Sequence, residues 1–128
     1  MDMHVFGPDL ALGIPALDQG HKVIFDLLIG LESLPRPQFD DACRELVAEL
    51  SEDIQNEEEL MASIAYPNAE VHCAAHARLL ECLDHAMVLL ARGDEASARR
   101  AIHFLPEWIE AHINTMDLAL AVALSKRR

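Results

Sequence analysis

Apolar residues recur at spacings of three and four along most of this chain, which is the pattern of amphipathic helices. The first predicted helix begins near Asp18, a good N-cap residue, and ends before Pro35. The same spacing predicts further helices over about 40–64 and 69–91, and a fourth from 94 to the basic residues at the end of the chain. No segment shows the alternation of a β-strand over a convincing length.

Pro106 lies inside the fourth predicted helix, where it removes one backbone donor and should kink or split the helix. Residues 1–15 contain two glycines and two prolines and are expected to form an N-terminal arm without regular structure. Four helices joined by short turns predict an all-α fold, an up-down-up-down four-helix bundle that follows this arm. Because 128 residues suffice for one core, we expect a single domain over residues 1–128.

Composition narrows the range of partners. The chain is 52% hydrophobic but only 5% aromatic, so its core must be mostly aliphatic. Ten basic and 22 acidic residues give a net charge of −12, which repels phosphate backbones and anionic lipids, so we expect neither a nucleic-acid nor a membrane partner. No apolar run reaches the roughly 18–20 residues that span a bilayer, and no basic segment resembles a secretory signal, so a cytoplasmic location is expected.

Helical geometry sorts the seven histidines of the chain. An α-helix turns about 100° per residue, so His72 and His76 project from one face of the third predicted helix, and Asp53 and Glu57 from one face of the second. Both pairs lie within or beside apolar stripes, where unpaired polar groups are costly. Since neutral imidazole and carboxylate oxygen are good ligands for iron, zinc or manganese, the two pairs predict a metal site in the bundle core.

The fourth predicted helix adds His112 and Asp117, which are five residues apart. In an ideal helix their side chains would differ by about 140°, whereas a one-residue π-bulge would bring them to nearly the same side. We therefore predict a bulge or irregular turn between them. The first helix contributes His21, so each helix offers an inward ligand candidate. The histidines that are expected to face outward or to lie in the arm, with no assigned role, are His4, His85 and His103.

These residues stand in segments that resemble the hemerythrin-like proteins of the bacterial single-domain type. The resemblance rests on Leu12–Asp18 followed by His21, on Glu57–Met61 followed by Tyr66-Pro67, His72 and His76, and on Trp108–Ile113 followed by Asp117. These segments resemble the opening, central and closing signatures of the family, and the likeness runs almost from end to end.

The resemblance implies a non-haem di-iron centre inside the bundle, with O2 bound reversibly at one iron. The histidines that would ligate one iron are His72, His76 and His112. His21 would ligate the other iron, and Glu57 and Asp117 would bridge the two together with an oxo or hydroxo group. Ile109 would lie in the apolar wall of the O2 pocket.

The chain departs from the family at Asp53, because the family has a histidine four residues before the bridging glutamate. Three interpretations stay open: Asp53 ligates the second iron through oxygen, giving a site of four histidines and three carboxylates; it is too short and leaves a water or an open position; or the second metal is lost or weakly held. A smaller departure is Phe6, where the family commonly has tryptophan.

Three functions are compatible with these residues. The first is an O2-binding protein, for storage or sensing, rather than an enzyme. The second is a redox-active di-metal protein that reacts with peroxide or nitric oxide, or that oxidises Fe²⁺. The third is a helical interaction module with a relic site. A third carboxylate would lower the net charge of a hydroxide-bridged diferrous site from about +1 to about 0 and favour Fe³⁺, which predicts faster autoxidation than in an all-histidine relative.

Overall fold

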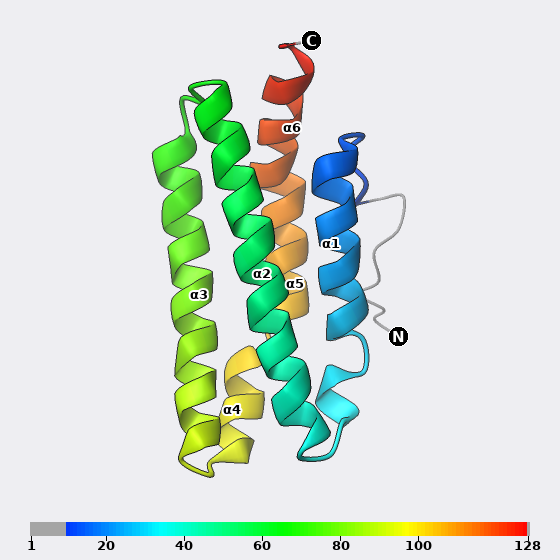
Figure 1. The fold of residues 1–128 in the computed structure, drawn as a ribbon, viewed down its shortest axis with the longest axis vertical. Helices are drawn as coiled ribbons and strands as arrows, with labels where there is room; N and C mark the ends of the chain where they lie inside the picture. The colour runs from blue at the N-terminus through cyan, green and yellow to red at the C-terminus, as the bar shows by residue number, and fades with distance from the viewer. Residues whose placement is uncertain (1–9, 128) are drawn as a thin grey trace.

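The computed structural model describes residues 10–127, which form helices connected by short turns (Figure 1). Three long helices come first: α1 (Pro15–Leu28), α2 (Gln38–Ser63) and α3 (Ala69–Ala91), with a short 3-10 turn, η2 (Leu31–Ser33), between the first two. The last quarter of the chain forms α4 (Glu95–Ile102), α5 (Leu105–His112), the π-helical turn η3 (Ile113–Asp117) and α6 (Leu118–Ser125).

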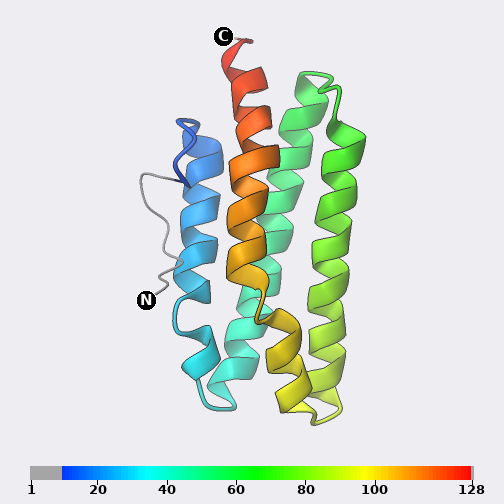
Figure 2. The same cartoon turned by 180° about the vertical axis from the view of Figure 1, so that it is seen from behind.

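The elements pack as a four-helix bundle whose neighbours run in opposite directions. α1 leads down to the turn at η2, α2 returns, α3 descends beside it, and α4, α5 and α6 together make the fourth ascending rod (Figures 1 and 2). The all-α, up-down-up-down bundle predicted from the sequence is therefore confirmed. Within residues 10–127, no helix is both long enough and apolar enough to cross a membrane.

The start of α1 differs from the prediction, which placed Asp18 at the N-cap. The helix begins three residues earlier, at Pro15, whose fixed φ suits the first turn of a helix. The Asp18 carboxylate instead accepts hydrogen bonds from the backbone N–H groups of Leu12, at 2.8 Å, and Gly13, at 3.1 Å. It therefore fixes the preceding loop. Most of the predicted arm, with His4 and Phe6, lies outside the described residues.

The fourth rod is split near Pro106, as predicted. α4 opens after Asp94, whose carboxylate accepts a hydrogen bond from the backbone N–H of Ser97 at 3.2 Å. It ends at Ile102, and α5 restarts at Leu105 with Pro106 in its first turn, where the missing donor does no harm. The third helix spans the predicted residues, and the second begins two residues earlier than predicted and ends one residue earlier.

A π-helical turn joins α5 to α6, which confirms the predicted irregularity between His112 and Asp117. The extra residue rotates Asp117 toward the bundle axis, where it is 1% exposed. Thr115 lies inside this turn, and its hydroxyl donates a hydrogen bond to the carbonyl oxygen of Ala111 at 2.8 Å. This side-chain donor supports the backbone where the regular pairing pattern changes.

Aliphatic side chains from all four rods fill the interior, and Phe25 and Phe39 are the aromatic residues that are wholly buried with them. Six buried residues of the described chain are polar or charged. They are His21, Asp53, Glu57, His72, His76 and Asp117. Such groups are rare in a core unless each has a partner, so their concentration marks the functional part of the bundle.

Candidate metal centre

All seven residues proposed from the sequence as ligands lie in one cluster inside the bundle. They come from α1 (His21), α2 (Asp53 and Glu57), α3 (His72 and His76), the end of α5 (His112) and the π-turn (Asp117). Their ligand atoms form two groups, each with atoms within 4.8 Å of one another, and Glu57 belongs to both groups. We call these the histidine-rich half and the carboxylate-rich half of the cluster.

The histidine-rich half contains three imidazoles around two carboxylate oxygens. Oε1 of Glu57 lies 3.3 Å from Nε2 of His72 and 3.1 Å from Nε2 of His76. Oδ1 of Asp117 lies 2.9 Å from Nε2 of His72 and 3.2 Å from Nε2 of His112. Three ring nitrogens thus converge with two oxygens, which is a set of donors that suits a transition metal ion.

The carboxylate-rich half is built around His21. Its Nε2 lies 2.9 Å from Oδ2 of Asp117 and 3.1 Å from Oε2 of Glu57. Oδ2 of Asp53 is farther away, at 3.9 Å. Glu57 and Asp117 therefore each turn one oxygen toward the histidine-rich half and the other toward His21. This is the arrangement that two bridging carboxylates between two metal ions would need.

Several buried atoms of the cluster have no hydrogen-bond partner within the described residues. They are Nδ1 of His21, Oε1 of Glu57, Nδ1 and Nε2 of His72, Nε2 of His112 and Oδ1 of Asp117. An unsatisfied buried polar atom is costly, and a group of them in one place calls for an explanation. Metal ions would satisfy the nitrogen and oxygen atoms that face one another, so the residues fit a metal centre.

The acid–base balance of the cluster supports this fit. Burial opposes the charged form of His21, but hydrogen bonds to Asp117 and Glu57 outweigh it and raise its pKa to about 10. Burial likewise disfavours the Asp117 carboxylate, yet the imidazoles of His112, His21 and His72 beside it hold its pKa well below its usual range. Without metal, protons on the imidazoles supply the positive charge that the carboxylates require, and metal ions would take the place of these protons.

Asp53 differs from the other two carboxylates. Burial and the nearby charge of Glu57 raise its pKa to about 7. No hydrogen bond from a histidine offsets these effects, in contrast to Glu57 and Asp117. A carboxylate in this environment gains most from a nearby cation.

Two residues outside the proposed ligand set support the histidine-rich half. Oε2 of Glu58 lies 3.1 Å from Nδ1 of His76, and such a contact fixes the tautomer and orientation of an imidazole whose other nitrogen binds metal. Glu58 lies about 100° around α2 from Glu57, so the helical period alone does not identify it as a neighbour of His76. The Trp108 ring stacks on His112 with centroids 5.1 Å apart and planes at 10°. Their i, i+4 spacing is the signal that could have identified this contact.

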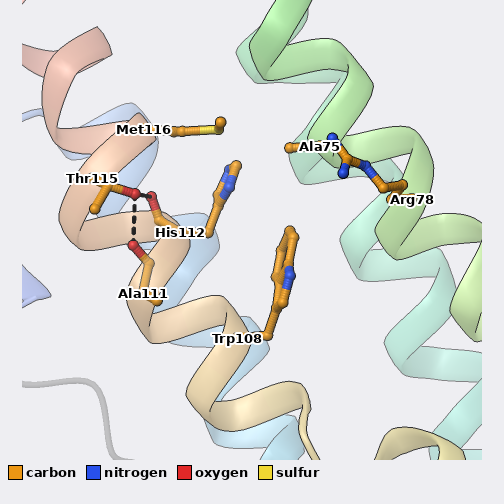
Figure 3. A pocket seen from close by; sticks show the side chains of 7 residues that line it. All are labelled: Ala75, Arg78, Trp108, Ala111, His112, Thr115 and Met116. Atoms are coloured by element: carbon orange, nitrogen blue, oxygen red, sulfur yellow. Dashed lines mark hydrogen bonds between the residues drawn. The ribbon is translucent and has the colours of Figure 1, made fainter.

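Several spaces in the molecule adjoin the histidine-rich half, among them a mostly apolar pocket of about 350 Å³ beside His72. An interior cavity of about 20 Å³ lies among the ligand candidates and apolar residues that include Ile109. A larger, mostly apolar pocket of about 310 Å³ opens between α3 and α5 (Figure 3). In it the stacked rings of Trp108 and His112 lie opposite Ala75 and Arg78, with Met116 above them (Figure 3).

The outward-facing histidines agree with the prediction wherever the structure describes them. His85 and His103 are exposed. Nδ1 of His103 lies 2.6 Å from Oε1 of Glu32, a surface ion pair that joins two residues 71 positions apart.

Comparison with known proteins gives a consistent result. Residues 12–124 match the hemerythrin family, described as the hemerythrin HHE cation binding domain. The chain is 27% identical over 118 residues to a bacteriohemerythrin of Ralstonia nicotianae, covering 92% of this chain and 86% of that protein. It is 29% identical over 130 residues to a bacteriohemerythrin of Stenotrophomonas maltophilia, covering 94% and 81%. It is 28% identical over 116 residues to hemerythrin subunit 1 of Golfingia vulgaris, covering 91% and 89%.

No solved structure matches the chain. The family match nevertheless extends from the loop before α1 to the last helix, and it includes all four rods that supply the buried cluster. This chain therefore belongs to the hemerythrin family.

Proposed function

We propose that this protein holds two iron ions in the buried cluster and binds O2 there. The observation that carries the proposal is the placement of Glu57 and Asp117, each of which offers one oxygen to His21 and the other to the histidine-rich half. One ion would be held by the histidines of that half, which are His72, His76 and His112. The other would be held by His21 and Asp53, with an oxo or hydroxo group completing the bridge between the two ions.

For Asp53 we favour the first of the three interpretations, in which its carboxylate is a ligand. Its oxygen shares a group of closely spaced ligand atoms with His21 and Glu57. It is also buried and has no hydrogen-bond donor among the described residues to stabilise its charge. Ligation of a metal ion supplies that stabilisation.

When bound, the iron pair supplies the redox chemistry and the binding position for O2. The protein contributes the surroundings. The interior cavity of about 20 Å³ has room for one molecule of about the size of water, and Ile109 lies in its wall. An apolar wall admits O2 and gives water few partners, so it favours reversible binding over reaction.

Metal content and colour test this proposal. We expect two iron ions per chain and a visible absorption band that appears with O2 and disappears when O2 is removed. The matched pair of variants is His21→Ala, which removes a proposed ligand, and His85→Ala, which removes an exposed histidine of α3. We expect loss of one iron in the first and none in the second. Fewer than two irons in the native protein, or no reversible band, would contradict the proposal.

A second candidate, redox chemistry on peroxide or nitric oxide, is favoured by one observation. Asp53 supplies an anionic oxygen where the family pattern has a histidine. It also lines a polar pocket of about 280 Å³, whereas the pocket beside His112 in the other half is mostly apolar. Repeated additions of hydrogen peroxide separate the candidates. Sustained consumption over many equivalents supports an enzyme, whereas a single bleaching step supports an O2-binding protein. The net charge of −12 opposes binding to a nucleic-acid partner.

A further inference from the structure

The polar pocket beside Asp53 lies between α1 and α2 and is distinct from the apolar pocket of Figure 3. Its polar and acidic lining comes from Gln19, Glu49, Glu52, Asp53 and Asn56. The apolar pocket contains no carboxylate and is bordered by the cationic side chain of Arg78. The two openings therefore offer opposite electrostatic surroundings to an approaching ion.

Asp53 connects this pocket with the metal cluster. It lines the pocket on one side and the interior cavity with His21 and Glu57 on the other. It is 9% exposed, and its nearest basic atom, Nε2 of His21, is 3.9 Å away. Among residues 10–127 it has no hydrogen-bond donor, so a buried carboxylate stands without a close partner at the inner end of an acidic pocket.

Gly20 makes this placement of Asp53 possible. It lies inside α1, directly before His21, where glycine is less favourable for a helix than alanine. A Cβ atom at this position would overlap Oδ1 of Asp53 and come within 2.9 Å of its Cγ. The Asp53 carboxylate therefore occupies the space that a side chain at position 20 would fill.

We propose that this pocket is the route by which Fe²⁺ reaches the second metal position, with Asp53 as the first buried ligand that the ion meets. The inference rests on the proposed function, because it assumes that the carboxylate-rich half holds a metal. Glu49 and Glu52 concentrate divalent cations at the opening, and field lines focus in a pocket with low-dielectric walls. Gly20 leaves Asp53 room to receive the ion and pass it to His21, Glu57 and Asp117.

The test follows uptake of Co²⁺ by the metal-free protein under anaerobic conditions, in a stopped-flow spectrophotometer. The phase that belongs to the second position is the one that His21→Ala removes. In the double variant E49Q/E52Q we expect this phase to slow at least about fivefold and to lose most of its dependence on ionic strength. The other phase and the final content of two Co²⁺ per chain should not change, because a route governs the rate and a ligand governs the affinity.

The control is E81Q/D84N, which removes the same amount of charge from exposed positions of α3 that lie outside the pocket. We expect its second phase to stay within about twofold of the native rate. Equal slowing in both double variants would show that the net charge of the protein, and not this pocket, attracts the ion, and would overturn the proposal. An unchanged rate in E49Q/E52Q would overturn it as well.

Gly20→Ala gives an independent test. This variant is expected to fold, since alanine suits a helix interior better than glycine. The added methyl group must displace Asp53, so we expect second-phase uptake at least about tenfold slower with circular dichroism unchanged. Uptake at the native rate would overturn the role of Gly20 and of the route. If the native protein binds fewer than two Co²⁺, the proposed function fails and the route with it, whereas two ions taken up at rates insensitive to these variants overturn the route alone.

Discussion

Glu57 and Asp117 turn an oxygen to each half of the buried cluster, but the halves differ in their other ligand candidates and in what surrounds them. The histidine-rich half draws three imidazoles from α3 and α5 and lies beside an apolar pocket. The carboxylate-rich half has one imidazole, His21, and the extra carboxylate of Asp53, beside an acidic pocket. One protein interior thus presents two candidate metal positions of different charge.

The halves also differ in how firmly their side chains are held. In the histidine-rich half, Glu58 contacts the outer nitrogen of His76, and Trp108 stacks on His112. The outer nitrogens of His72 and of His21 have no hydrogen-bond partner among the described residues. Two of the three imidazoles of the histidine-rich half are therefore supported, whereas the one imidazole of the other half is not. Pre-organised ligands bind metal more tightly, so we expect the first metal ion to occupy the histidine-rich half.

Removing a carboxylate that both halves share should give the largest effect. In Glu57→Gln, one oxygen becomes an amide nitrogen and the charge that faces three histidines is lost. We expect metal affinity to fall at least about 100-fold in both halves, measured by competition with a chelator of known affinity. Glu81→Gln, at an exposed position of α3, is the control. A variant that keeps one tightly bound ion would show that Glu57 serves only one half.

Exchanging the ligand candidate Asp53 should change redox behaviour more than metal content. Asp53→His would raise the formal charge of the diferrous site by one, which stabilises Fe²⁺. We expect the absorbance change produced by O2 to decay about tenfold more slowly in the variant than in the native protein, measured at constant O2. Decay in the native protein that is equal or slower would contradict the idea that Asp53 promotes oxidation.

The sequence predicted the bundle well because its helices are long and strongly periodic, and Gly93, Asp94 and Pro106 mark clear boundaries. It also predicted the π-turn, since His112 and Asp117 could share one side only if an extra residue were accommodated. The predicted start of α1 was wrong. Asp18 can cap a helix or accept hydrogen bonds from the preceding loop, and the spacing alone does not choose between these roles.

The features that escaped prediction are those that depend on the distance between helices. Periodicity gives the direction of a side chain around its own helix but not which residue of the neighbouring helix it meets. The contact of Glu58 with His76 is of this kind, since α2 and α3 bring the two side chains together from 18 residues apart. The role of Gly20 also escaped prediction, because only the structure shows that Asp53 occupies the space beside it.

Weakening the support of the histidine-rich half should give a smaller effect, confined to that half. In Glu58→Ala the outer nitrogen of His76 loses its carboxylate partner. Because the Glu58 side chain is 39% exposed, we expect a loss in affinity for the first metal ion at the low end of the usual range, about tenfold. Glu59→Ala, one residue along and exposed, should bind as the native protein does. An equal loss for the second ion would mean that the halves are not independently supported.

The smallest effect should come from a histidine–carboxylate pair that lies in water. The Glu32 carboxylate raises the pKa of exposed His103, so the pair stabilises the fold fully below about pH 6.5 and loses this contribution as the pH rises through the raised pKa. Comparing the thermal midpoint of the native protein with that of Glu32→Gln, we expect a difference of at most about two degrees at pH 6, absent at pH 8.5. A difference that persists at pH 8.5 would assign the stabilisation to packing of Glu32 instead of its charge. In that case, burial of the Glu57 carboxylate and exposure of the Glu32 carboxylate would not by themselves explain why the two substitutions differ in effect.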